Sequence, residues 1–125
     1  MNARYNAGRN GFGLKRINWE TDTIQAVLIS SLYQFSNAHR TLSSVSGKIS
    51  EPADITGRTV DDEGFALALP VVFPKVLADL KAVGCVIFKR NAELIAFYDE
   101  IDGFPLVANG GDIDLAWPNN KLFRL

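Results

Sequence analysis

Between residues 17 and 33 the chain changes from alternating polar and apolar positions to an uninterrupted apolar run. Residues 23–26 read Thr, Ile, Gln, Ala, and Val27 and Ile29 then make the second face apolar as well. A β-strand places successive side chains on opposite faces, so this pattern is typical of a strand that begins at an edge and ends between covered neighbours. We therefore predict a central strand here, with Trp19 closing one end of the core.

A second apolar region, residues 83–101, has the pattern of a buried hairpin. Residues 83–88 are apolar or small on both faces, as in a central strand. The more polar residues 89–93 favour a turn, and residues 94–101 return as an apolar partner strand.

The later part of the chain has shorter β patterns. Residues 112–117 alternate cleanly, which directs an isoleucine, a leucine and a tryptophan to the core and two aspartates to water. The segments 65–73 and 104–107 are β-rich and contain or adjoin prolines, which limit strand length and favour sheet edges.

Helical periodicity is weak throughout. Residues 74–84 carry the clearest helical signature, with Pro74 near the start, apolar side chains three or four positions apart, and Gly84 at the stop. We predict one short helix or turn there. Residues 1–16 mix Asn, Gly and Arg with scattered apolar side chains and fit neither periodicity, so they are predicted to form an extended arm.

Together these patterns predict a mainly β protein. The expected fold is a compact antiparallel β-sandwich or barrel-like domain with one short helix and an extended N-terminal arm. The arm spans residues 1–16 and a single β domain spans residues 17–125. A chain of 125 residues is long enough to bury roughly two-thirds of its unfolded surface around one core.

Charge is unevenly distributed along the chain, although the total is nearly balanced. The chain has 13 basic and 14 acidic residues, yet residues 1–19 contain four basic residues and no acidic one. This segment therefore carries +4, and the nine basic and 14 acidic residues that follow give −5. Such an arm is expected to attach electrostatically to an acidic surface, with Tyr5, Phe12 and Leu14 as apolar anchors.

Few residues indicate catalytic, cofactor or metal chemistry. His39 is the only histidine, so a site built on two imidazoles is not available, and a lone histidine in a polar loop is usually solvated. The single cysteine, Cys85, lies in an apolar run and is predicted to be a small buried hydrophobe. The acidic residues 61–63 lack the spacing of a calcium loop. The sequence therefore predicts no catalytic, cofactor or metal-binding residues.

One enzymatic alternative is a small hydrolase built on Asp99, Glu100 and Asp102. Carboxylates this close in a turn usually face solvent, and no nucleophile or second base accompanies them, so we expect no enzymatic activity. The apolar runs are too short for a membrane span, and the N-terminal residues do not resemble a cleaved leader. The composition, 47% hydrophobic and 22% charged, is that of an ordinary globular protein and does not favour nucleic-acid coating.

Several segments give the chain a family resemblance. They are INWETDTI at residues 17–24, Val27-Leu28, TGRTV at 56–60, VIFK at 86–89, the series Ile113, Leu115 and Trp117, and Leu122-Phe123. Over residues 17–125 the chain resembles a family of small structural proteins of tailed bacteriophage virions, which are compact β domains encoded among head and tail genes. It departs from the family's common form in its longer basic N-terminal arm and in residues 74–83.

The resemblance implies a part of a phage particle, made in the host cytoplasm. The leading hypothesis is a capsid decoration (cement) protein that binds the major capsid protein through its arm and neighbouring copies through its β domain. The alternative is a tail, neck or fibre-base component. No nucleic-acid or membrane partner is expected.

The residues expected to mediate these contacts fall into two groups. The arm residues predicted to bind the partner protein are Arg4, Tyr5, Arg9, Phe12, Lys15 and Arg16. A chain that ends on alternating apolar residues suggests a terminus docked into the sheet or into a neighbouring subunit. The candidates for contacts between subunits, in a trimer or another closed homo-oligomer, are Leu122, Phe123 and Leu125.

Overall fold

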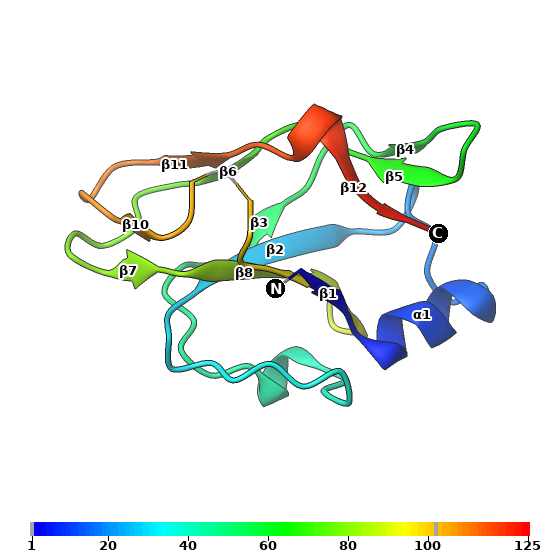
Figure 1. The fold of residues 1–125 in the computed structure, drawn as a ribbon, viewed down its shortest axis with the longest axis horizontal. Helices are drawn as coiled ribbons and strands as arrows, with labels where there is room; N and C mark the ends of the chain where they lie inside the picture. The colour runs from blue at the N-terminus through cyan, green and yellow to red at the C-terminus, as the bar shows by residue number, and fades with distance from the viewer. Residues whose placement is uncertain (1, 102) are drawn as a thin grey trace.

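A five-stranded antiparallel sheet forms the centre of the fold (Figure 1). In the computed structural model, which describes residues 2–101 and 103–125, the strand order is β1–β9–β8–β2–β3. These strands are Ala3–Arg4 (β1), Leu94–Tyr98 (β9), Gly84–Lys89 (β8), Ile24–Ile29 (β2) and Ala53–Asp54 (β3). The sequence-based prediction of a central strand and a buried hairpin is confirmed, because β2 pairs with β8 along its whole length and β8 pairs with β9.

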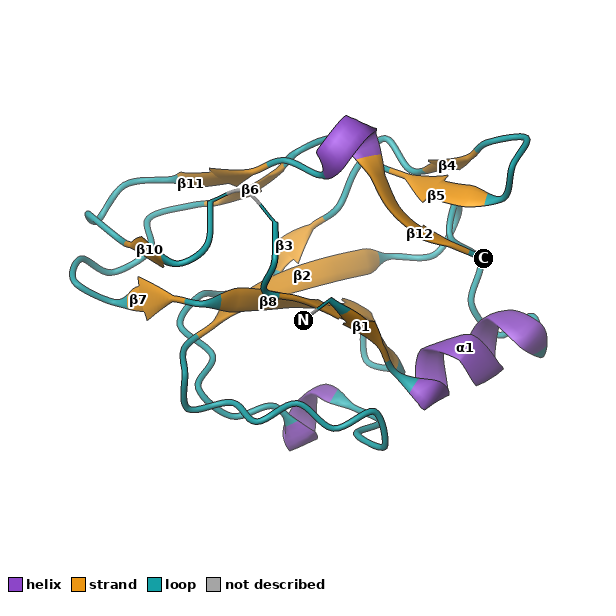
Figure 2. Cartoon of the chain, viewed as in Figure 1, coloured by secondary structure: helices purple, strands orange, loops and turns teal. Residues whose placement is uncertain are grey.

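Three smaller antiparallel sheets complete the architecture (Figure 2). They are β7–β10 (Lys81–Ala82 and Leu106–Val107), β6–β11 (Val71–Phe73 and Ile113–Leu115), and β4–β5–β12 (Thr59–Val60, Phe65–Leu67 and Lys121–Arg124). Two short 3-10 turns lie at Leu42–Ser44 and Pro118–Asn120. The protein is therefore mainly β, as predicted, but no sheet of the described residues closes into a barrel.

The apolar side chains form two clusters, one on each face of the five-stranded sheet. The side chains of β2 contribute to both clusters. Ile24 and Leu28 belong to the larger cluster, and Val27 and Ile29 belong to the smaller one. The larger cluster is shared with the small sheets, whereas the smaller one is covered by loop 30–50, mainly through Tyr33 and its neighbours. Each face of β2 is thus shielded by a different part of the chain, which explains why its pattern is apolar on both sides.

The prediction of an extended N-terminal arm is wrong. Residues Ala3–Arg4 form β1, which pairs with β9 at the edge of the central sheet, and Asn6–Gly13 form the helix α1. Tyr5, between them, is 0% exposed, and its hydroxyl lies 2.6 Å from the Tyr33 hydroxyl. The segment has little helical propensity of its own, so it is ordered by docking onto the sheet, which local periodicity cannot reveal.

Of the short helix or turn predicted over residues 74–84, the structure has turns and no helix. This stretch forms turns and the short strand β7, which pairs with β10. Lys75 has a φ of 49° and Asp79 a φ of 69°, and a residue in the left-handed region cannot continue a right-handed helix. Pro74, which indicated the start of a helix, lies in a turn, and Gly84, which indicated its end, is the first residue of β8.

Gly8 is the closest point between α1 and the sheet, and it yields the first prediction. A Cβ at position 8 would lie 2.7 Å from both the Ile95 Cα and the Leu94 carbonyl oxygen, which are backbone atoms that cannot yield without moving β9. We expect Gly8→Ala to lower the free energy of unfolding by about 1–3 kcal/mol, as measured by urea denaturation followed by circular dichroism.

Gly13 provides the matched control for this substitution. It ends the same helix, and nothing lies within 4 Å of a Cβ added there. Gly13→Ala is therefore expected to leave stability unchanged or to raise it by up to about 1 kcal/mol. Equal stability of the two variants would mean that α1 does not pack against β9 as described.

Candidate functional site

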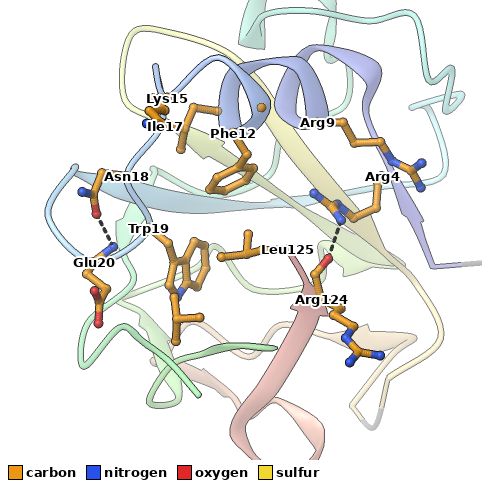
Figure 3. Close-up of a pocket in the computed structure, with 12 residues that line it drawn as sticks. Arg4, Arg9, Phe12, Lys15, Ile17, Asn18, Trp19, Glu20, Arg124 and Leu125 are labelled. Atoms are coloured by element: carbon orange, nitrogen blue, oxygen red, sulfur yellow. Dashed lines mark hydrogen bonds between the residues drawn. The ribbon is translucent and has the colours of Figure 1, made fainter. Parts of the chain in front are cut away.

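A groove of about 820 Å³ lies between α1, the loop that follows it, and the end of β12 (Figure 3). We call it the basic groove. Its apolar surface comprises Phe12, Ile17, Trp19, Val60 and Leu125. Its basic side chains are Arg4, Arg9, Lys15 and Arg124. Glu20 is the acidic residue among the described residues that line it. The groove is thus electropositive around an apolar floor.

The aromatic part of the floor is rigidly held. Trp19 is buried, donates a hydrogen bond from Nε1 to the Leu67 carbonyl oxygen at 3.1 Å, and meets the Phe123 ring edge-on with 5.3 Å between ring centroids. Phe12 packs against the same Phe123 ring, with 5.9 Å between centroids. Phe123 therefore lies beneath both aromatic residues of the groove and fixes their positions.

Arg58 holds the backbone on the Trp19 side. Its Nε donates to the Trp19 carbonyl oxygen at 2.6 Å and its Nη1 to the Ile55 carbonyl oxygen at 2.5 Å, and its Nη2 donates to the Asp22 carbonyl oxygen. Because the five donors of a guanidinium point in fixed directions, one side chain can hold several carbonyl groups in place. Arg58 thus fixes the bend that carries Trp19 into the groove.

Arg4 forms part of the opposite wall. Its Nη1 donates to the Arg124 carbonyl oxygen at 2.9 Å, and its guanidinium carbon lies 4.3 Å from the centre of the Phe123 ring. Burial lowers the pKa of Arg4, and the positive charge of Arg9 lowers it further. This wall therefore holds positive charges close together, and an anion placed there would relieve their repulsion.

Two other cations of the groove, Arg9 and Lys15, are exposed and flank Phe12 (Figure 3). Neither side chain makes a hydrogen bond or ion pair with any described residue. Arg124 is partly engaged, since its Nε donates to the Glu63 carbonyl oxygen at 2.9 Å. Arg9 and Lys15 are consequently the cations of the groove with the most freedom to meet a partner.

The structure gathers some of the predicted contact residues and separates others. Of the six arm residues, four line the basic groove. Tyr5 does not, because it is buried in the smaller apolar cluster, and Arg16 instead makes an ion pair with Glu93, with 3.4 Å between Nε and Oε2. Tyr5 is therefore part of the core and is not a partner-binding anchor.

The three candidates at the end of the chain also differ from one another. Phe123 is only 8% exposed and packs inside its own chain, so it is not presented to another subunit. Leu122 is half-buried against the larger cluster, whereas Leu125 is 49% exposed and lines the basic groove. Only Leu125 is well placed for an intermolecular contact.

Other chemically interesting side chains have structural surroundings. His39 Nδ1 lies 2.8 Å from the Tyr33 hydroxyl, and Cys85 is fully buried, which raises the pKa of its thiol. The Asp99 and Glu100 backbone N–H groups donate to the Asn2 side chain. Asp102, the third member of the hydrolase alternative, lies outside the described residues. Within those residues no group of three His, Cys, Asp or Glu side chains could hold a metal ion.

Comparisons with known proteins add no assignment. No protein-family model, no curated protein and no solved structure matches this chain. No helix in the described part of the chain is long and apolar enough to cross a membrane.

The burial of Phe123 yields the second prediction. Because this ring supports Phe12, Trp19 and Arg4, Phe123→Ala is expected to lower the free energy of unfolding by about 3–5 kcal/mol. Thermal and urea unfolding of the purified protein would measure this loss.

Leu125→Ala serves as the control at the same strand end. This side chain is half-exposed, so the change should alter stability by less than about 0.5 kcal/mol. If Phe123→Ala were as stable as the unmodified protein but altered its oligomeric state, the assignment of Phe123 to the core would be wrong.

Proposed function

We propose that this protein is a structural component of a tailed-phage particle, a capsid decoration (cement) protein that attaches to the major capsid protein through the basic groove. The observation that carries the proposal is the groove itself. It joins four basic side chains and an aromatic floor on a concave surface, where the sequence alone suggested a free arm.

The chemistry of the groove supports a docking role. Aromatic and arginine side chains dominate the binding energy of protein interfaces, and a desolvated apolar centre with a polar rim is their usual arrangement. Here Phe12, Val60 and Leu125 form the centre, and the basic side chains form the rim. No histidine or cysteine is among the described residues that line the groove.

The position in a phage particle is supported by the sequence resemblance over residues 17–125. Trp19 and Arg58 lie in two of the resembling segments, and in the structure Arg58 positions Trp19 through hydrogen bonds. The part of the chain that resembles virion proteins thus builds one side of the groove, and the basic N-terminal segment builds the other.

Contacts between copies would use the opposite end of the molecule. Exposed apolar side chains on β6, on loop 74–80 and on β10 are Val72, Leu77 and Val107, with exposures of 48%, 72% and 64%. Loop 74–80 and β10 lie toward the end of the long axis away from α1, and β6 lies nearer the middle (Figure 1). A closed homo-oligomer, such as a trimer, would cover them while leaving each basic groove facing the shell.

The third prediction concerns binding to the particle. Arg9 is exposed and makes no contact that the fold needs, so Arg9→Glu is expected to keep the native circular dichroism spectrum. Reversing its charge should weaken binding to purified heads that lack the protein by roughly tenfold. Co-sedimentation of added protein with these heads would measure the affinity.

Arg40→Glu is the matched control, because Arg40 is exposed in loop 30–50 and does not line the groove. It makes the same change in net charge and should bind as the unmodified protein does. Equal weakening by both variants would point to general charge attraction. Hundreds of copies per particle would support the head, and about a dozen or fewer would favour the tail or neck alternative.

A further inference from the structure

We infer that the partner of the basic groove is an extended peptide segment in which carboxylates lie on both sides of a large apolar side chain. This inference rests on the proposed docking function of the groove and specifies the chemistry of the segment that docks. It follows from the order of charged and apolar groups across the groove.

The first step is the spacing of Arg9, Phe12 and Lys15. Arg9 and Phe12 lie on α1, and Lys15 follows the helix in a left-handed conformation with a φ of 62°. Residues three positions apart on a helix lie on one side of it. Figure 3 shows Arg9 and Lys15 on opposite sides of Phe12, so a cation, an aromatic ring and a second cation follow one another along the groove.

The second step is the apolar surface at the centre of the groove. Val60 and Leu125 extend the partly exposed Phe12 surface across the groove, and they are 37% and 49% exposed in the free protein. A leucine or phenylalanine side chain of a partner would cover these groups and remove apolar surface from water. The groove volume, about 820 Å³, is within the range of roughly 300–1,000 Å³ that is usual for ligand sites.

The third step is the identity of the anion. Three of the four cations are arginines, whose planar forks match carboxylate geometry and form paired hydrogen bonds with it. A nucleic-acid backbone would also be attracted, but it carries a continuous row of charges. The acidic turn at residues 61–63 directly follows Val60 of the groove, and Glu20 lines the groove itself. Separate carboxylates around an apolar residue fit this surface better than a polyanion does.

The test is fluorescence anisotropy with the full-length protein and labelled synthetic peptides. The probe is Ser-Asp-Glu-Leu-Glu-Asp-Ser, and its comparison peptides replace Leu with Ser, or every Asp and Glu with Asn and Gln. A single-stranded oligothymidine of similar length tests the polyanion alternative. Salt titration accompanies each measurement.

We expect the probe to bind and the Leu-to-Ser peptide to bind about tenfold more weakly. The uncharged peptide should lose a similar factor, and Arg9→Glu and Lys15→Glu should each weaken probe binding about tenfold, while Arg40→Glu should leave it unchanged. Circular dichroism of each variant would establish that it is folded. Absence of binding at millimolar peptide, equal binding of the Leu and Ser peptides, or tighter binding of oligothymidine would each overturn the inference.

The outcome separates this inference from the proposed function. Binding to particles that depends on Arg9, without peptide selectivity, would refute the partner chemistry and leave the docking role intact. Selective peptide binding by a protein that is absent from purified particles would support the partner chemistry and refute the virion assignment.

Discussion

Because the central strands β2 and β8 are apolar on both faces, this short chain has to cover both faces of its main sheet. Fully burying a Val, Leu, Ile or Phe side chain is worth about 1.5–3 kcal/mol, and both strands are almost entirely composed of buried residues. The small sheets cover one face. Loop 30–50 covers the other, and Tyr5 completes that cover from the N-terminal segment. The N-terminal segment is therefore held in place because Tyr5 buries apolar surface on one face of the sheet.

The parts of the fold that depend on local alternation could be predicted from the sequence. Strand positions near Val27, Ile87 and Leu115 follow from a period of two, which needs only neighbouring residues. The helix at Asn6–Gly13 could not be predicted, since it depends on distant groups. Three glycines disfavour a helix at Asn6–Gly13, yet Gly8 is what allows α1 to approach β9. Conversely, the favourable pattern at 74–84 is overridden by left-handed residues.

The candidate site, like the fold, could be predicted from the sequence only in part. The charge asymmetry of the first 19 residues singled out Arg4, Arg9, Phe12 and Lys15, all of which line the groove. Their partners could not be found by any local signal, since Arg4 contacts Arg124 across a sequence separation of 120 residues. The same limitation applies to Tyr5, which the sequence predicts to bind a partner, and to Phe123, which it predicts to contact another subunit. An aromatic residue in a polar segment can equally be one that docks into its own core.

Binding through a preformed groove costs less conformational entropy than binding through a free arm would. Ordering a disordered segment on binding costs about 1–2 kcal/mol per residue in backbone entropy, and a free arm would meet that cost at the moment of docking. Here α1 and β1 are ordered within the folded protein, so binding has only to order side chains and the partner. The stability of the groove therefore depends on the packing of Tyr5 and Gly8 against the sheet. In the proposed docking role, changes at these two positions would weaken binding by undocking α1, whereas changes at Arg9 would act on the contact with the partner.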